Sequence, residues 1–203
     1  NDDILIGWTT IRDNSTTVVT PTGWTALYGP DNGGSTVTVR SFIFARTEDG
    51  TEPASLGIAF STNVNVLKMG WIFRFRGATA SGFNEGGKAT AGTSATISAA
   101  TCTSSGQNRL ALQFVFVADD NTLASYGAAT GGTWTEFGEF LTTGGLDGAL
   151  QLQQASLTNT TIVGGSTVMA ASDPWGIRTF ALVGATEGYS GRLGRGIGRG
   201  FGR

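Results

Sequence analysis

Carboxylates are the main side chains that could do chemistry in this chain of 203 residues, because it contains no histidine and a single cysteine. Histidine is the commonest general base and the commonest metal ligand. Neither a Ser-His-Asp nor a Cys-His centre can therefore be built from this chain alone. One cysteine also excludes an internal disulfide framework. We expect Cys102 to be a small, partly buried apolar residue and the protein not to be an enzyme.

Asp119-Asp120-Asn121 offers oxygen ligands of the kind that Ca²⁺ prefers. The motif lacks the alternating spacing of a calcium-binding loop and the later Glu that completes one, so the sequence favours a turn. Asp2-Asp3 could join a cation site, but solvation at the chain end is the simpler interpretation. We predict no metal and no cofactor.

Five further carboxylates could do glycosidase chemistry only if the fold placed two of them about 5–10 Å apart across a cleft. They are Glu48, Asp49, Glu52, Glu136 and Glu139. The first three surround a turn. The last two lie three positions apart in a strand-like run, so we expect them on opposite faces of the strand. We assign no catalytic residue.

Tryptophan side chains could form a platform on which sugars stack. The chain has five of them: Trp8, Trp24, Trp71, Trp134 and Trp175. Trp71 lies on an all-apolar strand face, and we expect most of the set to pack in or at the edge of a core. The aromatic residues that could face a ligand are Trp24, Tyr28, Tyr126 and Trp134.

The C-terminal segment has a different character. Arg192, Arg195, Arg199 and Arg203 are separated by glycines, and Leu193, Ile197 and Phe201 recur every four positions. Four of the 13 basic side chains lie here, so the remaining nine stand against 15 acidic ones and the body is acidic. The segment could be a solubilising tail or a weak phosphate binder. We predict an arm that orders on a neighbouring subunit, where arginines meet carboxylates and the apolar residues fill pockets.

Strands are the elements that must position these groups. In residues 66–76, Leu67, Met69, Trp71, Phe73 and Phe75 alternate with mainly polar residues, so they define one apolar face. A similar alternation in residues 109–118 predicts a second strand, with one face on the core and the other face open to water or a partner. Further strands are predicted at residues 4–11, 24–28, 36–46, 56–61, 133–140, 149–157, 166–171 and 175–183. Clusters of Gly, Asn, Asp and Pro predict turns, among them residues 29–34, and residues 81–93 are predicted to form a long loop.

These elements predict an all-β protein, a two-sheet antiparallel β-sandwich that is jelly-roll-like. Residues 1–186 form the sandwich domain and residues 187–203 the Gly/Arg-rich arm. Residues 4–11, 22–27 and 70–78 resemble residues 110–117, 132–137 and 175–185 in order and in spacing. We therefore predict an internal duplication with halves at about residues 1–86 and 92–186.

Composition excludes several classes of protein. Charged residues make up only 14% of the chain and its net charge is −2, so we expect neither disorder nor nucleic-acid binding by the body. No apolar run is long enough to span a membrane. The 32 glycines carry no collagen period and fit turns between many short strands. Because the chain opens directly on a strand, we also expect a further N-terminal segment.

The order of these segments resembles a diffuse group of virion surface β-sandwich proteins of tailed bacteriophages. The resemblance covers roughly residues 1–185. It is carried by an opening strand, a Pro-x-Gly-Trp-Thr turn, an alternating strand, Glu-Pro-Ala-Ser and a strand ending in Arg-Gly. In this chain these are Asn1–Ile11, Pro21-Thr22-Gly23-Trp24-Thr25, Val37–Arg46, Glu52-Pro53-Ala54-Ser55 and Trp71–Gly77, and the second half adds Trp-Thr-Glu-Phe and Asp-Pro-Trp-Gly. The Arg/Gly arm is not part of the pattern.

The resemblance implies a virion structural protein, a capsid decoration (cement) protein on the capsid exterior. Such a protein would stabilise the shell through multivalent contacts with the major capsid protein or with neighbouring copies, as a homo-oligomer. The alternative is a carbohydrate- or receptor-binding module of a tail fibre or cell surface. We expect neither a membrane nor nucleic acid as a partner.

Overall fold

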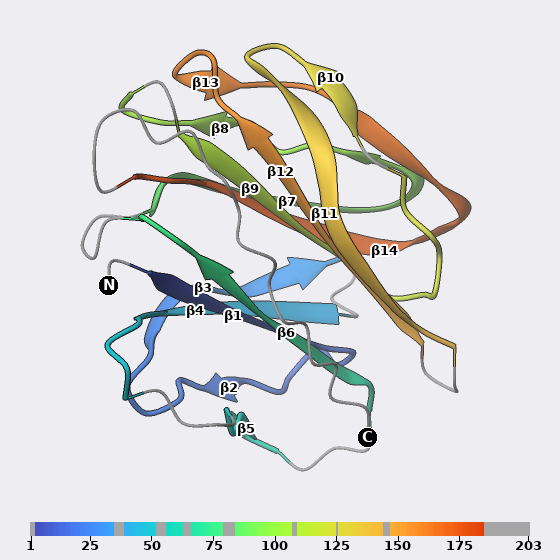
Figure 1. Ribbon diagram of the computed structural model, residues 1–203. Helices are drawn as coiled ribbons and strands as arrows, with labels where there is room; N and C mark the ends of the chain where they lie inside the picture. The colour runs from blue at the N-terminus through green and yellow to red at the C-terminus, as the bar shows by residue number, and fades with distance from the viewer. Residues whose placement is uncertain are drawn as a thin grey trace.

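The computed structural model describes residues 3–34, 39–51, 56–62, 66–78, 84–106, 109–124, 126–143 and 147–184. Within these ranges the chain forms antiparallel strands and no helix, so the prediction of an all-β sandwich is confirmed (Figure 1). The same ranges contain no helix that is both long and apolar enough to cross a membrane. The predicted arm, residues 187–203, lies outside the described residues.

Two large sheets face each other in Figure 1. The four-stranded sheet has the order β3-β4-β1-β6, with β1 at Ile4–Ile11, β3 at Thr25–Gly33, β4 at Val39–Thr47 and β6 at Lys68–Phe75. The six-stranded sheet has the order β10-β11-β12-β9-β14-β7. Its strands are β7 (Asn84–Ser98), β9 (Leu110–Val117), β10 (Gly127–Ala129), β11 (Gly132–Thr142), β12 (Gly148–Ser156) and β14 (Ser166–Leu182).

The central core fills the space between the two large sheets. The apolar face predicted for β6 is confirmed, because Met69, Phe73 and Phe75 are buried there and Leu67 and Trp71 pack against them. Leu110, Leu112, Phe114 and Phe116 of β9 face them from the other sheet. Burial of side chains of this size contributes about 1.5–3 kcal/mol each, so this layer contributes strongly to the stability of the sandwich.

Two small sheets cover the outer faces of the large ones (Figure 1). β2 (Val18–Val19) pairs with β5 (Ala59–Phe60) over a cluster of Ile11, Phe42 and Phe44. β8 (Cys102–Thr103) pairs with β13 (Thr161–Ile162) over a second core that includes Val115 and Val117. β9 is therefore buried on both faces, and the prediction that one of its faces meets water or a partner is wrong.

The strand order repeats between the two halves of the chain. In the four-stranded sheet the strands follow the order β3-β4-β1-β6. In the six-stranded sheet, β11-β12-β9-β14 follow the same order, with β9, β11, β12 and β14 in the places of β1, β3, β4 and β6. The three pairs of similar segments fall on equivalent strands: β1 with β9, β3 with β11, and β6 with β14. This strand order agrees with a duplication, but the duplication and the jelly-roll-like connection stay predictions.

Residues 84–93, predicted as part of a long loop, belong to the 15-residue strand β7. That prediction is wrong because the strand consists mainly of Gly, Ala, Thr and Ser and so has no apolar alternation to signal it. Its backbone pairs with β14, from Asn84 opposite Leu182 to Ser98 opposite Ser166. Two predicted strands, residues 166–171 and 175–183, are likewise one strand, β14, which passes through a register shift between Val168 and Asp173.

Residues 29–33, predicted as a turn, lie in the edge strand β3. Two register shifts against β4, between Ala26 and Tyr28 and between Tyr28 and Asp31, accommodate Gly29 and Pro30 without ending the strand. This irregular strand carries Asp31, whose carboxylate is buried and bound by Arg178 of β14. Arg178 Nε donates to Asp31 Oδ2 at 2.8 Å, and its guanidinium lies 4.4 Å from the centre of the Tyr28 ring. An ion pair thus connects the two large sheets.

Candidate functional site

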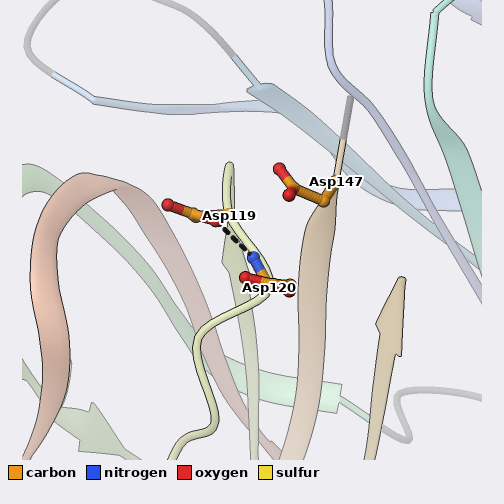
Figure 2. A group of neighbouring side chains, drawn as sticks. All are labelled: Asp119, Asp120 and Asp147. Atoms are coloured by element: carbon orange, nitrogen blue, oxygen red, sulfur yellow. Dashed lines mark hydrogen bonds between the residues drawn. The ribbon is translucent and has the colours of Figure 1, made fainter. Parts of the chain in front are cut away.

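Three aspartates lie together at one end of the six-stranded sheet (Figure 2). Asp119 and Asp120 follow the last residue of β9, and Asp147 precedes the first residue of β12. Because β9 and β12 are antiparallel neighbours, with Val117 opposite Ala149, these ends meet. Carboxylate oxygens of the three residues lie within 4.8 Å of one another. We call Asp119, Asp120 and Asp147 the acidic cluster.

The surroundings of the acidic cluster only partly compensate its charge. Arg12, which follows β1, places Nη1 3.1 Å from Asp147 Oδ1 and donates to the Asp147 carbonyl oxygen at 3.0 Å. Asn121 Nδ2 donates to Asp173 Oδ2 at 2.9 Å. Asp173 of β14 therefore belongs to the same end of the molecule.

Two carboxyl groups at this end, those of Asp120 and Asp173, have raised pKa values. Partial burial raises the pKa of Asp120, and the carboxylates of Asp119 and Asp147 raise it further. Burial also raises the pKa of Asp173, and the charge of Asp119 adds to the effect while the hydrogen bond from Asn121 opposes it. The ionised forms repel one another here, as expected for carboxylates that share a site.

The acidic cluster provides three oxygen ligands that a hard cation such as Ca²⁺ could use, whereas Ca²⁺ takes six to eight. Asp147 already pairs with Arg12, and Asp119 Oδ1 accepts from the Asp120 backbone N–H at 2.8 Å. Residues 119–121, for which the sequence favoured a turn, form a bend and an irregular loop between β9 and β10. The sequence did not indicate Asp147. The predicted strands at residues 109–118 and 149–157 place Asp147 near Asp119 only once they are known to pair, as β9 and β12 do.

Glu136 and Glu139 lie on the same face of β11, so the prediction of opposite faces is wrong. A β-bulge between Glu136 and Gly138 inserts one residue and reverses the alternation. Glu139 Oε1 accepts from the Leu123 backbone N–H at 2.7 Å, and Gln151 Nε2 donates both to Glu136 Oε2 at 3.2 Å and to the Leu123 carbonyl oxygen. Burial raises the pKa of Glu139, and the charge of Glu136 raises it further. Glu139 therefore binds the loop that follows β9 directly, whereas Glu136 is connected to that loop only through Gln151.

The carboxylates of Glu48 and Asp49 bind different partners and do not form a common site. Glu48 Oε2 lies 2.7 Å from Arg74 Nε. Asp49 accepts from Thr51, whose hydrogen bonds lower the pKa of Asp49 to about 2. Asp3, expected to be solvated at the chain end, is instead buried and lies 2.7 Å from Arg74 Nη2, so that expectation is wrong. Glu52 lies outside the described residues.

Two of the aromatic residues expected to face a ligand do not reach the surface. Trp134 and Tyr126 are only 1% and 4% exposed, because β11 turns Trp134 into the outer core of the six-stranded sheet. Trp24 packs on the outer face of the four-stranded sheet and Tyr28 packs against the central core, so each keeps only part of its surface. These four side chains form no common platform.

The other expectations for single residues have mixed outcomes. Cys102 was expected to be partly buried, and it is fully buried in the outer core. The core or edge positions expected for Trp8, Trp71 and Trp175 are confirmed. The seven residues assigned to the arm lie outside the described part of the chain, and they are Arg192, Leu193, Arg195, Ile197, Arg199, Phe201 and Arg203.

An open groove of about 380 Å³ lies beside the first residues of β11 and the last residues of β12. Its walls carry the hydroxyl groups of Thr133, Thr135, Ser156 and Thr158 and the amide of Gln154. Thr133 and Thr135 flank Trp134 on β11, so they point to the face opposite the outer core. The residues that line it carry no charge, and the Gln154 Oε1 atom is buried without a hydrogen-bond partner.

No known family model matches this chain, and no curated protein and no solved structure is significantly similar to it.

Proposed function

We propose that this protein is a virion structural protein, a capsid decoration protein that stabilises the shell by binding and not by catalysis. The observation that carries the proposal is that the chain covers part of both outer faces of its own sandwich. β2 and β5 cover one face, and β8 and β13 cover the other. Contacts with partners then run through the edges and ends of the sheets, as expected of a module that packs side by side with others in a shell.

The arrangement of charged groups supports a binding role. Among the described residues, the carboxylates considered for catalysis are engaged by arginines, by backbone N–H groups or by neighbouring side chains: Glu48 by Arg74, Asp49 by Thr51, and Glu139 by Leu123. The buried ion pair of Arg178 and Asp31 ties the two large sheets together. A link between the sheets of this kind suits a part that reinforces a shell.

The mechanism is multivalent contact. Each subunit makes several weak contacts, through its sheet edges and through the basic arm, with the major capsid protein or neighbouring copies. Once one contact tethers the subunit, the others form at high effective concentration, so that retention is far stronger than any single contact. The arginines of the arm supply the contact with acidic neighbours.

Rebinding to particles tests this proposal. Particles of the source virus, stripped of this chain, are incubated with the full chain or with a chain truncated after Gly191, and bound protein is measured after sedimentation. We expect the full chain to bind at a fixed number of copies per particle and the truncated chain to be lost on washing, with both chains equally folded by circular dichroism. Absence of saturable binding by the full chain would contradict the decoration role, and equal retention would contradict the role of the arm.

A second function, binding of an uncharged glycan, is favoured by the groove between β11 and β12. Hydroxyl and amide groups hydrogen-bond sugar hydroxyls, and about 380 Å³ lies within the range of small-ligand pockets. The test is titration calorimetry with a panel of neutral oligosaccharides, comparing the wild type with Gln154→Ala. Binding that Gln154→Ala weakens, but that the exposed Thr96→Val variant of β7 does not, would support this function. No heat with any member of the panel would contradict it.

A further inference from the structure

The two large sheets end in four edge strands, and three of these carry features that prevent pairing with other chains. β3 is interrupted by two register shifts and contains Pro30. β10 has only three residues. β6 carries the charged residues Lys68 and Arg74. Bulges, proline, short length and charge are the devices by which natural sheets block edge-to-edge association.

The fourth edge strand, β7, carries fewer of these devices, because its residues 88–94 contain no proline, no register shift and a single charged residue, Lys88. It has 15 residues, pairs with β14 on one side, and has no described strand on its other side. From Gly86 to Ser98 it contains no proline, and Lys88 is its only charged residue. Residues 86–89, Ala91 and Thr93 are exposed. A long, exposed and nearly uncharged edge is a template for another strand.

Residues 88–94 form the regular part of this edge. They pair without interruption with β14, from Lys88 opposite Thr179 to Ser94 opposite Asp173, whereas register shifts occur on both sides of this stretch. An uninterrupted ladder keeps the outward backbone groups in line for a further antiparallel partner. The geometry for pairing is therefore best within these seven residues.

We propose that β7 pairs antiparallel with β7 of a second copy of this chain, so that two six-stranded sheets join into one continuous sheet. A two-fold axis at Ala91 places Ala91 opposite Ala91 of the second copy, Thr90 opposite Gly92, and Lys88 opposite Ser94. No like charges face each other, and the small side chains allow the close approach that directly opposed residues need, about 4.5–5.5 Å between Cβ atoms. Such a self-complementary contact is the isologous interface of a two-fold dimer.

The features of the β7 edge favour a second copy of the chain as its partner. A strand that differs from β7 would need its own long and uncharged edge, whereas a second copy presents one by necessity. The contact involves about seven residues from each chain, so it belongs to the small interfaces that associate weakly in solution, below about 1,200 Å² in total. This inference is independent of the virion role, because it concerns the isolated chain.

Sedimentation of the full chain over a wide concentration range tests the proposal. We expect the wild type to approach twice the mass of the chain at high concentration. Ala91→Lys and Ala91→Glu each place like charges at the two-fold axis and should give monomers only, whereas an equimolar mixture of the two variants should restore the dimer. Ala128→Lys, at an exposed position of the short edge strand β10, is the matched control and should sediment like the wild type.

Three outcomes would overturn the proposal. They are a wild-type chain that is monomeric at every concentration, a dimer that survives Ala91→Lys, and a mixture of the two charged variants that stays monomeric. Because the mixture tests rescue, a variant that merely fails to fold cannot imitate the expected result.

Discussion

Arg178 and Asp31 show how one pair of residues holds the two large sheets together. The side chains of Arg178 and Asp31 are 15% and 7% exposed, and the pair is bidentate. Removing one partner of such a pair leaves a buried charge without compensation, which costs about 3–5 kcal/mol. We predict that Asp31→Ala lowers the free energy of unfolding by this amount, measured by chemical denaturation.

Arg76 provides the control for this prediction. It is 63% exposed and lies 3.8 Å from Asp3, so Arg76→Ala should change the denaturation midpoint very little. Equal effects of the two substitutions would contradict the role that we assign to the buried pair.

Asp173 makes the stability of the fold depend on pH in a definite direction. Its pKa is raised in the folded chain, so its ionised form destabilises the fold at neutral pH and this penalty is relieved as the pH falls through the raised pKa. Asp173→Asn removes the charge and keeps an oxygen that can accept from Asn121. We predict that this substitution stabilises the protein at pH 7 and that the gain disappears at acid pH, measured by denaturation at a series of pH values.

Asp13 should behave in the opposite way. Hydrogen bonds from Thr16 and Ser15 hold its pKa well below the ordinary value of 3.8, so its ionised form stabilises the fold above that value and the contribution is lost as the pH falls through the lowered pKa. Asp13→Asn should therefore destabilise the protein at pH 7 and have little effect in strong acid. A shift of the same sign for both variants at pH 7 would contradict this account.

At the scale of elements, β7 and β14 fit together because Gly92 leaves room for the Trp175 ring. A Cβ atom at Gly92 would lie 2.7 Å from Trp175 Cζ2, so the ring would have to move. We predict that Gly92→Ala destabilises the protein by about 1–3 kcal/mol, the usual cost of overpacking, and changes its tryptophan fluorescence. Gly57→Ala, where a Cβ would meet nothing within 4 Å, is the control and should leave both properties unchanged.

Strands with apolar alternation could be predicted from the sequence, and strands without it could not. β1 begins and ends at the predicted residues, and the apolar face of β6 was predicted residue by residue because each buried side chain is large. β7 was missed because pairing of its backbone with β14 defines it, and small residues give no sign of that pairing. Asp31 was missed for a related reason, since residues 29–33 were expected to turn.

The candidate sites depended on contacts between distant segments and could be predicted only in part. Asp119 and Asp120 were recognised as neighbours in sequence, but Asp147 joins them only through the pairing of β9 with β12. The bulge in β11 reversed the face expected for Glu139. Local composition could not show either effect.

At the scale of the whole molecule, the covered faces and the open edge of β7 fit a module that works beside its neighbours. The outer cores under the small sheets withdraw Trp134 and Tyr126 from the surface, so an aromatic platform is not available to this chain in its described part. The same coverage buries apolar side chains on both outer sides of the sandwich within a single chain. The proposed decoration role therefore requires only lateral contacts that are individually weak, because multivalent binding strengthens retention.

The central claim is that this protein decorates the outside of a capsid. The measurement that tests it most directly is electron cryomicroscopy of native particles from the source material, with the sandwich fitted into the density. We predict a regular array of sandwiches on the capsid exterior, with the Gly/Arg arm in density on a neighbouring subunit. Particles whose capsid exterior carries no density for this fold would contradict the claim.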